Sequence, residues 1–268
     1  MALWLWLVLS AHAQQSVSPQ SRRRTKRAPD VVFECTERSR REDLQSIDNN
    51  AEDYAAMERL GLCALRHASG SDASAKEEGL SWLGRAAEGG SASALNNLGV
   101  IHAQGVGGVV PADGVRAASL YLDAAERGDT QALFNLGRLY EHGAPKLAPS
   151  LPTALDWYTR AAEEGDAQSA HAAAVMLSAG RGAAEPDMNE AARYFAVSAG
   201  DGDGPGSHSD AGDAMFMLGV MALKGEGTVQ DYGEAERQLR RAAREGHAPA
   251  AQLLESLGLA VGSASLDR

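Results

Sequence analysis

Residues 131–166 read QALFNLGRLYEHGAPKLAPSLPTALDWYTRAAEEGD, and this stretch decides the fold prediction. Ala132, Leu136 and Tyr140 stand four residues apart, a spacing that places side chains on one face of an α-helix. Gly143 then interrupts the pattern, and a second stretch rich in alanine follows it. The stretch therefore predicts two helices joined by a glycine-containing loop.

We expect the two helices over residues 131–142 and 152–164. Gly137 lies beside the apolar face of the first helix, although a glycine inside a helix costs about 1 kcal/mol relative to alanine. Its presence therefore predicts that a neighbouring helix approaches closely there. Trp157 and the alanines of the second helix are expected to face inward.

The same pattern recurs along the chain, which is typical of a repeat protein. Leu-Gly pairs are 38 residues apart over the first three copies, and a last copy follows an insertion: Leu60-Gly61, Leu98-Gly99, Leu136-Gly137 and Leu218-Gly219. Loop glycines recur at Gly105, Gly143, Gly180 and Gly225. Aromatic residues at one repeat position, predicted to be core, are Trp82, Trp157 and Tyr194. These independent patterns agree on one period, and they predict about five repeat units.

Helix-capping residues stand where each second helix should begin, because their side chains accept hydrogen bonds from first-turn N–H groups. These residues are Asp113, Ser150, Asp187 and Asp231. Asp187 with Glu190, and Asp231 with Glu234, fit the capping-box pattern. The stretch GDGDGPGSHSD over 200–210 interrupts the period and predicts a flexible surface loop.

The repeated Leu-Gly-x-x-Tyr-x-x-Gly, the Asp or Ser cap, Ala-x-x-Trp-Tyr and Ala-Ala-x-x-Gly-Asp resemble the Sel-1-like repeat family, which is related to tetratricopeptide repeats. The resemblance extends over about 52–260; it is best at 132–166, good at 94–129 and 214–246, and degraded at 169–201 and at 56–90, where His67 replaces the loop glycine. It implies a right-handed superhelical α-solenoid that scaffolds protein complexes. Many members of the family act in endoplasmic-reticulum quality control, in mitochondria, or in bacterial signalling and host contact.

These patterns divide the chain into four parts. We predict a signal peptide over 1–13, a basic then mixed-charge flexible segment over 14–45, an all-α repeat solenoid over 46–262 and a tail over 263–268. The last helix, over 250–259, is expected to close the solenoid.

The apolar run ALWLWLVLS over 2–10, followed by Ala-His-Ala, is typical of a secretory leader and predicts the endoplasmic-reticulum lumen or the exterior. A mitochondrial presequence is the alternative, because residues 1–29 lack acids before Asp30 and end in a basic cluster. The run is too short to cross a bilayer, so we expect no transmembrane segment in the mature chain. Arg24, Lys26 and Arg27 fit a dibasic processing site; a nuclear-import patch or a solvated basic tail are the other interpretations.

The formal net charge is −11, and the five cations of residues 22–27 have no acid before them, so the remainder carries −16. A chain this acidic is a poor nucleic-acid ligand, because phosphate contacts need clustered lysine and arginine. We therefore predict protein partners and no nucleic acid.

Cys35 and Cys63 are the two cysteines. They form a disulfide if the chain enters an oxidising compartment, or remain thiols with Cys63 in a helix core. We find no Cys-x-x-Cys or Cys/His ligand spacing and no paired histidines, so we predict no metal site and no cofactor. No nucleophile has a histidine beside it in the repeat, so we predict a non-catalytic protein, with a hydrolase as the remote alternative.

Partner binding is expected on the first helix of each unit, at positions opposite to its packing face. This stripe carries cations and amides but no acid, which favours an acidic or carboxylate-bearing peptide at its N-terminal half and apolar contact at its C-terminal half. The alternative is that these are merely solvated positions. The predicted groove residues are Arg59, Arg66, Asn97, Asn135, Arg138, His142, Val175, Met217, Val220 and Lys224.

Overall fold

The computed structural model describes residues 35–68, 72–200 and 210–259. The chain divides into two units, Met1–Val32 and Phe33–Arg268, and the described residues belong to the second. The predicted signal peptide, the processing site at Arg24, Lys26 and Arg27, most of the insertion loop and the tail lie outside the described residues.

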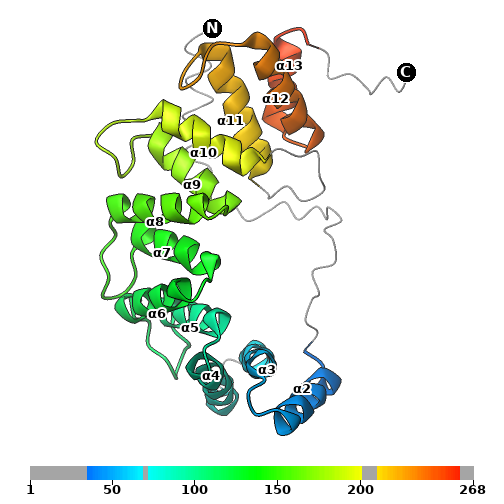
Figure 1. Ribbon diagram of the computed structural model, residues 1–268, viewed down its shortest axis with the longest axis vertical. Helices are drawn as coiled ribbons and strands as arrows, with labels where there is room; N and C mark the ends of the chain where they lie inside the picture. Colours follow the sequence, from blue (N-terminus) through cyan, green and yellow to red (C-terminus); the bar gives the residue numbers. More distant parts are fainter. Residues whose placement is uncertain (1–34, 69–71, 201–209, 260–268) are drawn as a thin grey trace. The chain divides into compact units, whose positions relative to one another are not determined.

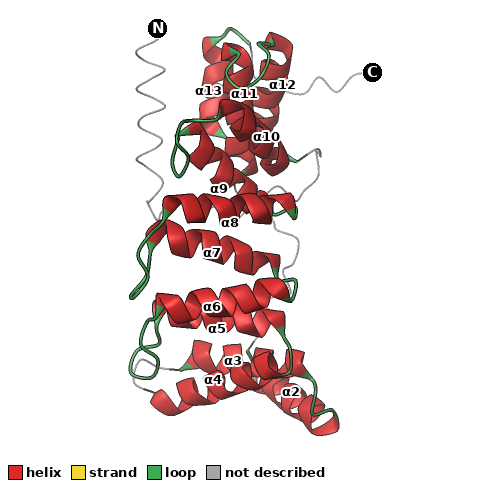
Figure 2. Cartoon of the chain, turned by 60° about the vertical axis from the view of Figure 1, so that its left-hand side comes forward, coloured by secondary structure: helices red, strands yellow, loops and turns green. Residues whose placement is uncertain are grey.

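The described residues form α-helices and no strand (Figures 1 and 2). In chain order the helices are α2 (Glu37–Asn49), α3 (Tyr54–His67), α4 (Ala73–Glu88), α5 (Ala92–Gln104), α6 (Gly114–Glu126), α7 (Thr130–His142), α8 (Leu151–Glu163), α9 (Ala167–Ser178), α10 (Met188–Ala199), α11 (Ala211–Lys224), α12 (Tyr232–Arg244) and α13 (Ala248–Ser256). Five antiparallel pairs run from α3–α4 to α11–α12, and each pair packs on the next. The predicted all-α repeat solenoid of five units is confirmed. We call the first helix of each pair helix A and the second helix B.

Three of the four predicted caps, the aspartates, are confirmed, whereas Ser150 stands at the N-cap of α8 without a side-chain capping bond and contacts Thr153 Oγ1 at 2.8 Å instead. Asp113 accepts hydrogen bonds from the N–H groups of Val115 and Arg116 at 3.1 and 3.0 Å. Asp187 and Asp231 cap α10 and α12 in the same way. These bonds satisfy first-turn donors that have no partner within the helix.

The two predicted capping boxes are wrong in their second half. A box needs the glutamate to accept the N–H of the cap residue. The N–H of Asp187 instead donates to the carbonyl of Leu177, and that of Asp231 to the carbonyl of Ala222, both at 3.0 Å. The cap N–H therefore ties helix B to its helix A, and Glu190 pairs with Arg193 instead.

Loop glycines end the A helices, because the chain turns there with positive φ angles that side chains rarely tolerate. Gly105 and Gly143 have φ of 75° and 72°. A Cβ at Gly143 would also lie 2.9 Å from Pro149 Cδ. In the first unit, which lacks this glycine, α3 ends at His67.

Helices A and B approach closely at the glycine of each Leu-Gly pair. A Cβ at Gly137 would lie 2.5 Å from the ring of Tyr158, and a Cβ at Gly99 would lie 2.5 Å from the ring of Tyr121. The predicted close approach at Gly137 is thus present. At the predicted aromatic position of helix B, Tyr194 is buried as predicted, whereas Trp82 and Trp157 are half-buried and the next residue, Leu83 or Tyr158, is buried instead.

Helix α2 corrects the prediction of a flexible segment up to residue 45. Thr36 and Ser39 form a reciprocal capping box at its start. Asp43 and Ile47 face α3 and are buried, at 5% and 8% exposure. This helix covers the first repeat, as the end of a repeat stack requires.

No helix among the described residues is long and apolar enough to cross a membrane.

Candidate functional site

The A helices α3, α5, α7, α9 and α11 carry the predicted groove residues, and the structure distributes these residues over three environments. Exposed residues are Arg66, Arg138, His142, Val175 and Lys224. Half-buried residues are Arg59, Asn97, Asn135 and Met217. Val220 is buried, at 5% exposure, and its placement in the groove is therefore wrong.

Arg59 is engaged within the chain. Its Nε and Nη2 atoms both donate to Oδ1 of Asp43, at 2.9 and 2.5 Å. The hydrogen bond to this buried carboxylate raises the pKa of Arg59. Arg59 thus fixes α2 on α3, and it does not offer its charge to a partner in the way that the sequence predicted.

Glu58 places an acid beside the predicted groove residues. Its carboxylate accepts hydrogen bonds from Ser91 Oγ, Ser93 Oγ and Asn97 Nδ2 of the next repeat, at 3.2, 2.5 and 2.9 Å. Three donors hold one carboxylate, so Asn97 is committed to an inter-repeat contact. Sequence reasoning missed Glu58 because it considered three positions of each A helix and left its neighbours out.

A second hydrogen bond between repeats joins two asparagines. Asn135 Nδ2 donates to Asn96 Oδ1 at 2.8 Å. This bond uses one of the two N–H donors of Asn135, so the side-chain carbonyl and the second donor remain for other contacts. Asn135 therefore differs from Asn97 in that it retains hydrogen-bonding capacity on a half-buried surface.

Arg138 is the exposed cation in the middle of the A-helix row. Its guanidinium lies 5.9 Å from the ring centroid of Phe134, in the range of a cation–π contact. Within the part of the chain that the structure describes, no carboxylate lies at ion-pair distance from Arg138 or Arg66. The nearby His142 Nδ1 lies 3.0 Å from the carbonyl oxygen of Arg138, so this ring is directed toward its own helix.

Val175 occupies the position of α9 that Arg138 occupies in α7, and it is 38% exposed. Met217 of α11 is half-buried and packs against the C-terminal core cluster. Lys224, at the end of α11, lies 3.4 Å from Glu226. The C-terminal half of the row thus offers one exposed apolar side chain, and fewer groups than the sequence predicted.

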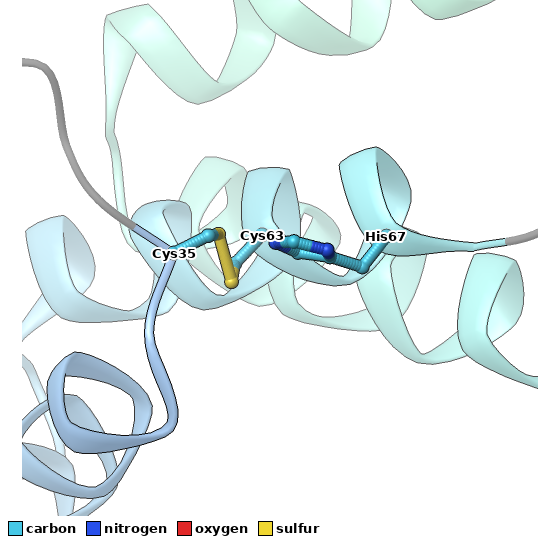
Figure 3. Close-up of side chains that lie close together, drawn as sticks. All are labelled: Cys35, Cys63 and His67. Carbon is cyan, nitrogen blue, oxygen red and sulfur yellow. A yellow bond between two sulfur atoms is a disulfide. The ribbon is translucent and has the colours of Figure 1, made fainter.

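A separate cluster lies at the junction of α2 and α3 (Figure 3). Cys35 and Cys63 are joined by a disulfide, with their Cα atoms 5.5 Å apart. His67 follows Cys63 by one turn of α3, and its imidazole lies beside the two sulfurs. The disulfide is one of the two states that the sequence left open for these cysteines. Sequence analysis missed His67 beside them, although the spacing Cys63-x-x-x-His67 is visible in the sequence and places both side chains on one face of a helix.

The comparisons with known proteins concern the whole repeat array. The Sel1 repeat model matches residues 55–91, 92–129, 130–166, 167–203 and 212–247. The chain belongs to the Sel1 repeat family. Sel1 repeats commonly mediate protein–protein interactions. A comparison with curated protein sequences finds no match.

Two solved structures resemble this Sel1 repeat protein in fold. One is c5321, a protective antigen of uropathogenic Escherichia coli with a Sel1-like repeat fold, at 24% identity and a TM-score of 0.65. The alignment covers 82% of this chain but 45% of c5321, so the chain spans less than half of that protein's length. The other is a Sel1 repeat protein from Oxalobacter formigenes, at 26% identity and a TM-score of 0.59, with 81% and 84% of the two chains covered.

Proposed function

We propose that this Sel1 repeat protein is a non-catalytic scaffold that holds an extended, carboxylate-bearing segment of a protein partner on its A helices. The observation that carries the proposal is Arg138, an exposed guanidinium that no carboxylate of the described residues neutralises. In a chain body of net charge −16, an unpaired arginine between half-buried amide and apolar side chains is a selective contact for a carboxylate. Hydrogen bonds to charged groups contribute about 1.5–3 kcal/mol each.

The proposed partner segment combines an acid with apolar side chains. Asn135 retains an amide carbonyl and an N–H for the backbone of an extended peptide, and Val175 supplies apolar contact one repeat further on. We place the binding surface on α7 and α9, with Arg66 as a second cation on α3; Asn97 of α5 is committed to Glu58. Arg59 and Val220 are left out, because one is paired with Asp43 and the other is buried.

A charge-reversal experiment tests the site. Partners are captured with the wild-type chain from its own cell fraction and identified, and their binding is then measured against the double variant Arg66→Glu/Arg138→Glu. The matched control is Arg116→Glu/Arg160→Glu, which makes the same charge change at exposed positions of helices B. We expect at least tenfold weaker binding for the A-helix variant and little change for the control. Equal losses in both variants, or none in either, would contradict the proposed surface.

We further propose that the chain acts in the secretory pathway, as the apolar run over 2–10 and the small-x-small motif over 11–13 suggest. A mitochondrial scaffold with the same fold is the alternative. N-terminal sequencing of the mature protein should begin near Gln14 for a secreted chain. If it begins just beyond Arg27, imaging of a C-terminally tagged copy distinguishes convertase cleavage from mitochondrial import.

A further inference from the structure

The two cysteine sulfurs of this chain lie beside an imidazole. Cys35 and Cys63 are the only cysteines in the sequence. Within the described residues, Cys35, Cys63 and His67 are the one group of three metal-ligating side chains whose ligand atoms all lie within 4.8 Å of one another. Two segments that are far apart in the sequence therefore bring both cysteines next to one histidine (Figure 3).

Each member of the group is positioned by its own local structure. Cys63 and His67 are four residues apart on α3, so they share one face of the helix. Cys35 stands directly before Thr36, the N-cap of α2, and the packing of α2 on α3 brings it across to Cys63. His67 also stands where later repeats carry a loop glycine, so this imidazole is peculiar to the first repeat.

The donor set matches the preferences of zinc. Two thiolates and one neutral imidazole are a common Zn²⁺ set, and bond lengths of about 2.3 Å to sulfur and 2.0 Å to nitrogen place tetrahedral ligand atoms roughly 3.5–3.8 Å apart. In the structure the ligand atoms all lie within 4.8 Å of one another, and the two sulfurs, which are bonded to each other, would separate to about 3.8 Å on reduction and metal binding. Two thiolates also neutralise the charge of the ion, and the C-terminal end of α3 favours a cation.

Access to the group is open. A surface hollow of about 280 Å³ is lined by both cysteines, His67, Thr36, Glu37 and Arg40. Arg40 turns its charge toward Glu78, at 2.7 Å, in an ion pair with α4. An ion can therefore reach the sulfurs from solvent through this hollow.

We propose that the reduced form of this protein binds one Zn²⁺ through the thiolates of Cys35 and Cys63 and the imidazole of His67. A dithiol reductant supplies two electrons and two protons: the Cys35–Cys63 bond breaks, two thiols form and the reductant becomes a disulfide. Zn²⁺ then displaces the two thiol protons. The α2–α3 junction is thus cross-linked in either state, by a covalent bond when oxidised and by the metal when reduced.

Cobalt substitution tests the proposal on the full chain. The protein is reduced with a water-soluble phosphine, which becomes a phosphine oxide, and is freed of it without air. It is then titrated with Co²⁺ and competed with Zn²⁺. We expect one equivalent of Co²⁺ to give thiolate charge-transfer and tetrahedral ligand-field absorption, and Zn²⁺ to abolish both signals. The oxidised chain should give neither signal.

Three variants identify the ligands. His67→Ala should weaken Co²⁺ binding by at least tenfold, and Cys35→Ser should remove the charge-transfer absorption of the native site. The matched control is His142→Ala, because His142 ends α7 as His67 ends α3; it should bind as the wild type does. Circular dichroism confirms that each variant is folded.

Four outcomes would overturn the proposal. These are a reduced, folded wild type that binds no Co²⁺, a His67→Ala variant with unchanged affinity, a disulfide that cannot be reduced while the chain stays folded, and equal weakening by His142→Ala. None of these outcomes bears on partner binding by the A helices, so the zinc site and the proposed function stand or fall separately.

Discussion

Gly137→Ala tests the packing on which the repeat depends. The added Cβ would lie 2.5 Å from both Cδ1 and Cε1 of Tyr158, whereas carbon atoms in good contact are about 3.5–4.0 Å apart. Tyr158 has little room to yield. Its side chain is 1% exposed, and its hydroxyl donates to Glu141 Oε2 at 2.9 Å, which anchors the far end of the ring.

Two opposing effects set the size of the change. Alanine is favoured over glycine inside a helix by about 1 kcal/mol. An extra methyl group in a packed core costs about 1–3 kcal/mol through displaced side chains and backbone. Because the clash involves a ring held at both ends, we take the upper part of that range and expect a net destabilisation of about 1–2 kcal/mol.

Gly84→Ala is the matched control. Gly84 lies inside α4, and no heavy atom would stand within 4 Å of a Cβ there. Only the helical preference of alanine remains, so this variant should be more stable by about 0.5–1 kcal/mol. The two glycine-to-alanine changes should therefore have opposite signs.

Urea unfolding followed by helical circular dichroism measures both variants. The Tyr158→Phe background adds a further check, because it removes the anchor to Glu141 and lets the ring shift; Gly137→Ala should cost less there than in the wild type. A Gly137→Ala protein that is stabilised as much as Gly84→Ala would refute the idea that the Leu-Gly glycines permit close approach of helices A and B.

Three further predictions concern the N-terminal junction and His171 of α9, which is half-buried. Asp43→Asn should destabilise the chain by about 1–2 kcal/mol in urea unfolding, less than a fully buried pair would because the Arg59 side chain is 40% exposed; unchanged stability would contradict the pairing. Cys35→Ser should cost roughly 3–4 kcal/mol under oxidising, metal-free conditions, because the disulfide closes a 28-residue loop; a loss below 1 kcal/mol would mean that the junction holds without it. Burial keeps the pKa of His171 below its ordinary value of 6.5, so the unfolded chain takes up a proton first as the pH falls below about 6.5, and folding stability declines there. His171→Gln should reduce that decline between pH 7 and pH 5, measured by urea midpoints at each pH, and an unaltered slope would exclude His171 as its source.

Much of the fold could be predicted from local sequence, because the features that repeat are local ones. Gly105 and Gly143 adopt positive φ angles that few other residues tolerate, so the turn imposes the residue. Asp113 and Asp187 cap their helices with bonds only two or three residues long. Because these turns and caps depend only on neighbouring residues, they can be recognised in the repeated sequence without knowledge of the rest of the structure.

The aromatic position shows where periodicity stops being sufficient. Trp157 and Tyr158 are adjacent, and both fit a helix face that is partly apolar. The ring that enters the core is Tyr158, because the missing side chain of Gly137 leaves space at that place. Choosing between neighbouring residues requires the crossing of two helices, which the sequence pattern alone does not fix.

The contacts that α2 makes could not be predicted from the repeat pattern. The sequence predicts Arg59 as a groove residue because its position on α3 points away from the repeat core. Arg59 instead pairs with Asp43, which belongs to a segment that lacks the repeat pattern. A contact that is made outside the repeat leaves no periodic signal in the sequence. A paired arginine and an unpaired one therefore look the same in the sequence.

The contrast between Arg59 and Arg138 also determines where binding should be strongest. A partner carboxylate at Arg59 would have to displace Asp43, which would leave a buried carboxylate without its cation, and breaking such a pair is costly. At Arg138 it would displace only solvent and a contact with the Phe134 ring. Within the N-terminal half of the row, over which the sequence predicted it, the free energy of binding an acidic segment should therefore come mainly from the third repeat and its neighbours, and less from Arg59 in the first repeat. Reversing Arg138 alone should weaken a captured partner more than reversing Arg66 alone, and the opposite order would return the main binding surface to the first repeat.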